Sequence, residues 1–179
     1  QVEGGLGNGV ARLAPVHELR HQRRRAAERE VERRGGAHAA VLEVAAQAAA
    51  RGLVGDLGSG KTTLAQGIAK GWGSLDPVSS PTFVLVNVYR RPDGLLLYHL
   101  DAYRLSGPAE AIDLDLDTML EQGPMLVEWA ERVQAALPAE GLWVHLNYVS
   151  EIQRDMIYTA RGAHYTALLI RFRKLVYGG

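Results

Sequence analysis

The chain has 179 residues and a mass of 19.5 kDa, which suits one domain with a real core and is too short for two ordinary domains. Its formal net charge of +0 gives no reason to expect a polyanion or a membrane surface as partner. Cysteine is absent, which excludes disulfides, thiolate metal sites and cysteine nucleophiles, and no apolar run approaches the roughly 20 residues of a membrane-spanning helix, so we expect a cytoplasmic protein.

The N-terminal segment, residues 1–36, differs in composition from the rest of the chain. Residues 1–34 carry eight arginines and five acidic residues, with few large apolar side chains. This composition favours a solvated helix or a disordered arm, and an arm that contacts RNA is the alternative. We therefore assign residues 1–36 to an atypical arginine-rich extension, disordered or helical, and residues 37–179 to the main domain.

The next elements alternate between helix and strand. "AHAAVLEVAAQAAAR", residues 37–51, is rich in alanine and predicts a helix ending at Gly52. "TTLAQGIAKGWG", residues 62–73, predicts a second helix. "SSPTFVLVNVY" and "LLLYHL", residues 79–89 and 95–100, predict two strands of an antiparallel hairpin around the turn "RRPDG".

The C-terminal part of the chain continues the alternation. "SGPAEAIDLDLDTMLEQG" predicts a helix that Ser106 caps, "PMLVEW" a short buried strand, and "AERVQAALP" a helical turn or two. "GLWVHLNYV" and "DMIYTA" predict strands, and "HYTALLIRFRKL" predicts a helix. That last helix places an apolar stripe against the core, made of Tyr165, Leu168, Leu169 and Phe172.

Residues 55–62 fit the phosphate-loop pattern G-x-x-x-x-G-K-[ST] without a mismatch, through Gly55, Gly60, Lys61 and Thr62. In such a loop the glycines let backbone N–H groups converge on phosphate oxygens. The lysine neutralises phosphate charge, and the hydroxyl corresponding to Thr62 ligates Mg²⁺. The bland alternative is a glycine-rich turn that binds nothing.

Two carboxylates follow predicted buried strands, Asp101 after "LLLYHL" and Glu128 after "PMLV". A phosphate loop needs a carboxylate at the end of a neighbouring strand to hold the metal ion or its water. Either residue alone would pass for an ordinary strand-end acid, and the residues do not separate their roles. Thr82, in "SSPTF", contacts the γ-phosphate or orders a water in this hypothesis, and is a plain turn residue in the alternative.

The motifs N-K-x-D and D-x-x-G are absent, which argues against a GTPase and favours ATP. No segment resembles the arginine-rich lid of a small-molecule kinase. A P-loop small-molecule kinase and a non-enzymatic RNA-binding adaptor that uses the basic arm remain as alternatives to an ATPase.

Four stretches, "GDLGSGKTTLAQGIAKGWG", "SSPTFVLVNVY", "LYHLDAYRL" and "LVEWAERV", resemble in order and spacing the bacterial TsaE family. These are the small ATPases of tRNA threonylcarbamoyladenosine synthesis. The likeness runs from about Gly55 to the C-terminus. It implies an α/β fold: a single P-loop NTPase-like domain with a central mixed sheet, parallel plus an antiparallel hairpin, flanked by helices.

The resemblance also implies cofactors and partners. The cofactors are ATP and Mg²⁺, and the partner proteins are TsaD and TsaB. They modify the adenosine next to the anticodon, so tRNA is reached indirectly through the complex. Neither a membrane nor DNA is implied as a partner. We expect a Mg²⁺-dependent ATPase that is weak alone and stimulated by its partners, because no arginine finger is evident within the chain.

Carried over by position, the resemblance implies site residues. Phosphate and nucleotide contacts fall to Gly55, Gly58, Ser59, Gly60, Lys61, Thr62, Thr63 and Trp129. Thr62 and Glu128 are the implied Mg²⁺ ligands. Asp101 is the water-activating or metal-proximal carboxylate, and Arg104 is a supporting charge. Family members usually read "HFDLYRL" where this chain has Leu100 and Ala102, a mild departure that removes no charge.

The sequence before the loop departs further from the family. A phosphate loop follows a buried strand of about five residues, yet only Leu53 and Val54 lie between Gly52 and Gly55. The sequence therefore predicts a first strand that is too short and a poorly anchored loop. A deletion, a frame error or a lineage-specific extension would each produce this. We also expect residues 1–34 to be dispensable for ATP binding.

Overall fold

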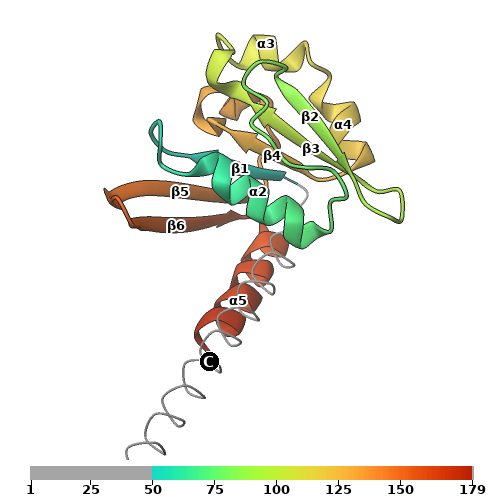
Figure 1. The fold of residues 1–179 in the computed structure, drawn as a ribbon. Coiled ribbons are helices and arrows are strands. Elements are labelled where there is room, and N and C mark those ends of the chain that lie inside the picture. Colours follow the sequence, from blue (N-terminus) through green and yellow to red (C-terminus); the bar gives the residue numbers. More distant parts are fainter. Residues whose placement is uncertain (1–49, 179) are drawn as a thin grey trace, which may run out of the picture. The chain divides into compact units, whose positions relative to one another are not determined.

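The computed structural model describes residues 50–178. Six strands form one sheet in the order β2-β3-β4-β1-β5-β6 (Figure 1). The four inner strands run parallel to one another, while β2 and β6, at the two edges, pair antiparallel with β3 and β5. The predicted mixed sheet with an antiparallel hairpin is confirmed. The arginine-rich extension and its boundary at residue 36 lie outside the described residues.

The first strand, β1 (Ala50–Val54), lies in the middle of the sheet between β4 and β5. It has five residues, so the prediction of a strand too short to hold the loop was wrong. The predicted helix over residues 37–51 is also wrong at its end, because residues 50 and 51 belong to β1. The local helix propensity of alanine yields there to pairing with two neighbouring strands. Residues 37–49 of that prediction lie outside the described part of the chain.

Gly52 lies where β1 packs closely against residues that cover one face of the sheet. A Cβ atom added to Gly52 would lie 2.7 Å from Cε3 of Trp143 and 2.9 Å from Cβ of Ala130. Glycine is therefore required by close packing at this position, rather than by a turn.

The hairpin strands are β2 (Val86–Arg90) and β3 (Leu96–Asp101). The predicted strand over residues 79–89 is thus shorter than expected, and its first part is a loop that carries Thr82. Pro81 shapes that loop, since its carbonyl accepts hydrogen bonds from the N–H groups of Val84 and Leu85 at 3.0 and 2.8 Å. β4 (Met125–Glu128) is the predicted short buried strand.

The predicted helix after β3 is interrupted. It divides into α3 (Pro108–Ile112) and α4 (Leu116–Gln122), preceded by the short 3₁₀ turn η1 (Ala102–Arg104). Ser106 does not cap it. The helix begins after Gly107, and Ser106 instead donates its backbone N–H and its hydroxyl to Oε2 of Glu110. The predicted turn after β4 consists of two 3₁₀ turns, η2 (Ala130–Arg132) and η3 (Gln134–Ala136).

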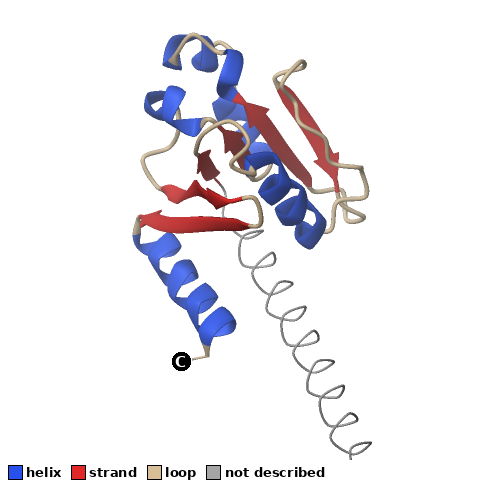
Figure 2. Cartoon of the chain, turned by 60° about the vertical axis from the view of Figure 1, so that its left-hand side comes forward, coloured by secondary structure: helices blue, strands red, loops and turns tan. Residues whose placement is uncertain are grey.

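Helices cover both faces of the sheet. On one face, α2 (Lys61–Trp72) buries Ala65, Ile68, Ala69 and Trp72 against a core that includes Leu53 and Leu126. On the other face, α3, α4 and the 3₁₀ turns pack around Trp143 and Val127 (Figures 1 and 2).

The chain ends in a long hairpin and a helix. β5 (Gly141–Ser150) and β6 (Gln153–Arg161) lead into α5 (Ala163–Tyr177). The predicted stripe of α5 is confirmed, because Tyr165 and Leu168 are buried against Leu142, with Leu169 and Phe172 packed beside them. No helix among the described residues is long and apolar enough to cross a membrane.

Candidate functional site

The glycine-rich loop joins the carboxyl end of β1 to the amino end of α2. Gly58 and Gly60 take left-handed φ values of 77° and 102°, which side-chain-bearing residues rarely adopt. The N–H of Ser59 donates to the carbonyl of Asp56 at 3.1 Å, and this bond closes the loop. The β-strand, loop and helix thus have the order that a phosphate loop requires.

The first turn of α2 has backbone N–H groups without partners in the helix, and it adjoins the loop. The intrahelical bonds of α2 start with Leu64, whose N–H donates to the carbonyl of Gly60 at 2.9 Å. The preceding N–H groups, those of Lys61, Thr62 and Thr63, belong to the first turn, where an α-helix offers its donors no partner of its own. Such a helix end favours an anion.

Lys61 is buried at the base of the loop, with only 5% of its surface exposed. Its ammonium donates hydrogen bonds to the carbonyls of Gly55 at 2.6 Å and Asp56 at 2.9 Å. It also lies 3.8 Å from the centre of the Trp129 ring. Burial lowers the pKa of Lys61 below its usual value, and the nearby Glu128 carboxylate opposes that shift.

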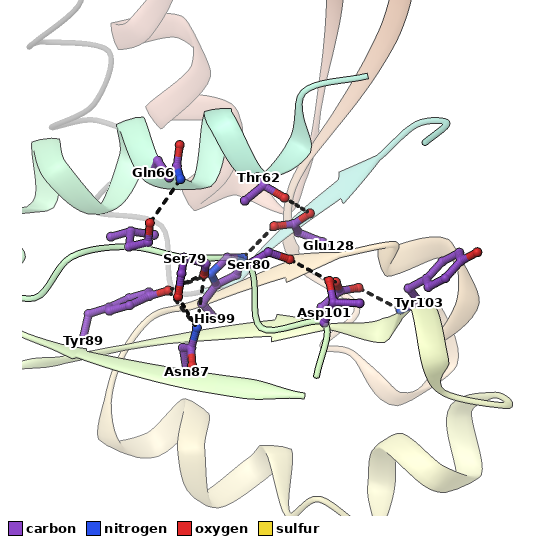
Figure 3. Close-up of polar contacts among 12 residues, drawn as sticks. Thr62, Gln66, Ser79, Ser80, Asn87, Tyr89, His99, Asp101, Tyr103 and Glu128 are labelled. Carbon is purple, nitrogen blue, oxygen red and sulfur yellow. Dashed lines mark hydrogen bonds and ion pairs between the residues drawn. The ribbon is translucent and has the colours of Figure 1, made fainter. Parts of the chain in front are cut away.

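Thr62 and Glu128, the two implied metal ligands, are brought together. The Thr62 hydroxyl donates to Oε2 of Glu128 at 2.8 Å (Figure 3). Glu128 is the last residue of β4 and pairs with Leu53 of β1. Leu53 is the last residue but one of β1, directly before the loop begins. The parallel register therefore places this carboxylate next to the start of α2.

Asp101 ends β3 in register with Glu128 of β4. Its Oδ2 accepts a 2.6 Å hydrogen bond from the Thr82 hydroxyl, and its Oδ1 accepts the N–H of Tyr103 at 2.9 Å. Both carboxylates are 3% exposed. The structure thus places the two candidate acids side by side, each engaged by a different threonine.

Trp129 has a left-handed φ of 57°, an uncommon conformation for a bulky residue. This turn follows directly after β4 and brings the indole over the ammonium of Lys61. The Tyr103 ring lies 5.0 Å from the Trp129 ring. Arg104, the implied supporting charge, is directed to an exposed aromatic residue instead, with its guanidinium 4.8 Å from the centre of the Phe83 ring.

The residues of the loop fit a triphosphate with Mg²⁺. The hydroxyl of Ser59 is buried and, among the described residues, has no hydrogen-bond partner. Buried polar groups are normally hydrogen-bonded, and an oxygen of a bound phosphate would supply the partner. A Cβ at Gly58 or Gly60 would meet nothing within 4 Å, so the backbone of the loop is open. No group of three or more His, Asp or Glu side chains in residues 50–178 could hold a metal ion unaided. Mg²⁺ bound by one or two protein groups plus phosphates needs no such group.

One residue at the loop was missed by sequence reasoning. Arg154, on β6, donates from Nε to the carbonyl of Ser59 at 3.1 Å and from Nη2 to that of Gly58 at 3.4 Å. Its guanidinium also lies 4.5 Å from the Tyr148 ring centre. No local motif marks this arginine, because it holds backbone carbonyls 95 and 96 positions earlier in the chain.

A second residue, His99, lies in the stretch "LYHLDAYRL", and the sequence predicted no role for it. It is fully buried on β3, and its Nε2 lies 2.9 Å from Oε1 of Glu128. The signal that would have found it is its position two residues before Asp101, which puts both side chains on one face of the strand.

Comparison with known protein families agrees with the geometry of the site. The model of the family described as "Threonylcarbamoyl adenosine biosynthesis protein TsaE" matches residues 26–156 of the chain. The chain belongs to the TsaE family. The match to TsaE begins upstream of the phosphate loop and ends at residue 156, so the expected likeness from about Gly55 to the C-terminus was wrong at both ends.

Individual TsaE relatives are similar over much of the chain. The tRNA threonylcarbamoyladenosine biosynthesis protein TsaE of Bacillus subtilis (strain 168) is 42% identical over 118 residues, covering 65% of this chain and 72% of that protein. The protein of the same name from Nostoc sp. (strain PCC 7120) is 43% identical over 108 residues, covering 58% and 65%. That from Streptomyces coelicolor is 49% identical over 81 residues, covering 44% and 55%.

A solved structure agrees with the fold. The crystal structure of Bacillus subtilis YdiB superposes with a TM-score of 0.59 at 32% sequence identity, covering 79% of this chain and 89% of that one. The α/β architecture is therefore shared with a protein of known structure.

Proposed function

We propose that this TsaE-family chain binds ATP with Mg²⁺ and hydrolyses ATP in support of threonylcarbamoyladenosine synthesis on tRNA, in the cytoplasm. The observation that carries the proposal is the hydrogen bond between Thr62 and Glu128. It joins the hydroxyl of the phosphate loop to a strand-end carboxylate, the pair that holds Mg²⁺ in P-loop NTPases.

Each residue of the site has a chemical role in this proposal. Lys61 and the loop N–H groups bind the phosphates, and Thr62 with Glu128 would hold Mg²⁺. When bound, Mg²⁺ supplies positive charge that offsets charge developing on the transferred phosphoryl group. Asp101 orients the attacking water or accepts its proton, and Thr82 orders the same region through its bond to Asp101. Trp129 shields the ammonium of Lys61 from water.

We further propose that the chain acts with TsaD and TsaB and reaches tRNA only through that complex. All three relatives described above carry tRNA threonylcarbamoyladenosine biosynthesis in their names, which supports the pathway. We expect slow hydrolysis by the isolated chain. Arg154 holds loop carbonyls and Arg104 packs on Phe83, so neither serves as an arginine finger in this arrangement, and partners would accelerate turnover.

The proposal is tested by nucleotide binding and turnover, with and without Mg²⁺, in wild type, Thr62→Val and Thr62→Ser. Removing the hydroxyl as Thr62→Val should raise the Mg²⁺ concentration needed for tight ATP binding by about 10- to 100-fold. Thr62→Ser retains a hydroxyl and should remain near wild type. Equal Mg²⁺ dependence in all three proteins would refute the assignment of Thr62.

Association is tested by a pull-down with TsaD and TsaB, with and without ATP, for wild type and Lys61→Ala. Failure to associate under every nucleotide condition would overturn the proposed role in the complex. Transfer of labelled γ-phosphate to a metabolite rather than to water would instead support a small-molecule kinase. Salt-dependent tRNA binding that is lost on deleting residues 20–34, with ATP binding intact, would support an RNA-binding adaptor.

A further inference from the structure

His99 has both ring nitrogens engaged in the interior of the protein. It is 0% exposed on β3. Its Nε2 lies 2.9 Å from Oε1 of Glu128, and its Nδ1 lies 3.2 Å from the hydroxyl of Tyr89 (Figure 3). An ionised carboxylate can only accept, so Nε2 of His99 donates to Glu128.

The two oxygens of Glu128 therefore have different partners. Oε1 accepts from His99, while Oε2 accepts the 2.8 Å bond from Thr62. Because each oxygen is held by a separate donor, the plane of the carboxylate is fixed and Oε2 is presented to the amino end of α2. Groups that hold a metal ligand in this way affect how tightly the site binds the metal ion.

Tyr89 connects the same network to the loop before β2. Its hydroxyl donates to the carbonyl of Ser79 at 3.0 Å, and Nδ2 of Asn87 donates to that carbonyl at 3.1 Å. Three residues further along, Thr82 donates to Asp101. The segment of residues 79–82 is thus tied to β3 at two points, through Tyr89 and His99 and through Asp101.

The pattern of β3 makes this arrangement unusual. Leu97, His99 and Asp101 alternate with Tyr98 and Leu100 and so share the face that α2 covers. An apolar residue at position 99 would extend the core formed there by Leu97 and its neighbours. A buried polar ring is favourable only when its polar atoms are paired, and both nitrogens of His99 are paired with residues of the site.

We propose that Tyr89 and His99 are a positioning pair that fixes the Glu128 carboxylate and couples it to the segment of residues 79–82. The proposal rests on the proposed function, since it gives Glu128 the role of Mg²⁺ ligand. Both side chains are buried, so the pair acts through Glu128 rather than by contact with nucleotide. The pair makes the orientation of the metal ligand and the position of Thr82 depend on each other, so a change at one is transmitted to the other.

The test replaces one ring nitrogen at a time. The side-chain nitrogen of glutamine lies near the place of Nε2 of histidine, whereas the polar atoms of asparagine lie near Nδ1. His99→Gln therefore retains the bond to Glu128 and loses the one to Tyr89, and His99→Asn does the reverse. Tyr89→Phe removes the same link as His99→Gln without changing the histidine.

Each variant has a distinct expected result. His99→Asn should raise the Mg²⁺ concentration needed for ATP binding by about 10- to 100-fold, with ATP affinity in the absence of Mg²⁺ unchanged. His99→Gln and Tyr89→Phe should keep wild-type Mg²⁺ dependence and lower kcat about 5- to 10-fold at unchanged KM, as a positioning effect of modest size. The double variant should be no slower than either single variant, because both remove one link.

Tyr98→Phe is the matched control. Tyr98 neighbours His99 on β3 and donates from its hydroxyl to Oε1 of Gln122 at 2.7 Å, away from the site. This variant should leave kcat and Mg²⁺ dependence at wild-type values while lowering thermal stability as much as Tyr89→Phe does.

Three results would overturn the inference. Equal Mg²⁺ dependence of His99→Asn and His99→Gln would show that the ring does not act through Glu128. A kcat for Tyr98→Phe as low as that of Tyr89→Phe would show a merely structural role. A wild type that binds ATP equally well with and without Mg²⁺ would overturn the proposed function as well, and so differs from the first two results, in which wild type behaves as proposed.

Discussion

The hydroxyl of Thr82 donates a 2.6 Å hydrogen bond to Oδ2 of Asp101, across 19 positions of sequence. The bond links the loop before β2 to the end of β3, next to Glu128. Asp101 is buried, yet its second oxygen is also satisfied, by the N–H of Tyr103. The acid is therefore held in one orientation before any ligand arrives.

Asp101→Asn should slow hydrolysis about 100-fold or more, the lower range for loss of a general base, while the Kd for Mg²⁺·ATP changes little. The amide keeps the shape of the side chain but not its charge. Turnover and nucleotide binding would be measured on the same preparation. Asp93→Asn is the control, because Asp93 is an exposed acid in the β2–β3 turn, paired with Arg91. Equal rates for both variants would exclude Asp101 from the reaction.

Lys61 leads to a pH-dependent prediction in the nucleotide-free protein. In the folded state, burial lowers the pKa of Lys61 below its usual value of 10.5. In the pH range just below 10.5 the unfolded chain therefore binds more protons than the folded one. The contribution of Lys61 to the free energy of unfolding therefore rises as the pH rises through that range. Lys61→Met removes the titrating group. Denaturant unfolding at a series of pH values would give the free energy of unfolding of wild type and of Lys61→Met. Relative to the variant, wild type should become more stable as the pH rises toward 10.5. A constant difference would contradict this.

Arg154→Lys should raise the Kd for ATP about tenfold, the effect of losing one hydrogen bond from a charged donor. A lysine retains the charge but not the planar fork that reaches the carbonyls of Ser59 and Gly58 together. Arg171→Lys, on an exposed position of α5, is the control. Calorimetric titration with ATP would measure both. If Arg154→Lys binds ATP as tightly as wild type does, the fork is not what supports the loop.

Gly52→Ala should destabilise the fold by about 1–3 kcal/mol through overpacking. The added Cβ would lie under 3.0 Å from Trp143 and Ala130, neither of which can move without disturbing a buried layer. Gly107→Ala, where a Cβ would meet nothing within 4 Å, should change stability far less. Both values come from urea unfolding, and equal losses would refute the packing argument.

Sequence reasoning succeeded where the signal was local. The β2–β3 hairpin follows from alternating β-branched residues around a turn, and α2 follows from the helix-forming run "TTLAQGIAKGWG" directly after the loop motif. The pairing of Asp101 with Glu128 was also accessible, because carboxyl ends of parallel strands meet at one edge of the sheet.

The failures have two causes, pairing between distant residues and a competing local contact of a side chain. β1 was taken for the end of an alanine-rich helix, since only its pairing with β4 and β5, more than 70 positions later, makes it a strand. Ser106 was expected to cap a helix with its hydroxyl, and that hydroxyl binds Glu110 instead. For β1, pairing outweighs the helix propensity of its residues, because a central strand forms hydrogen bonds with a neighbour on each side.

The support that Arg154 gives to the phosphate loop has a consequence for translation. Ser59 leaves the ribosome 95 residues ahead of the arginine that holds its carbonyl. A nascent chain that has emerged only as far as β5 carries the whole G-x-x-x-x-G-K-T motif without its clamp. The same is true of a proteolytic fragment that ends before β6. We therefore expect tight nucleotide binding only late in synthesis, and a fragment that ends before β6 should bind ATP more weakly than the finished protein does.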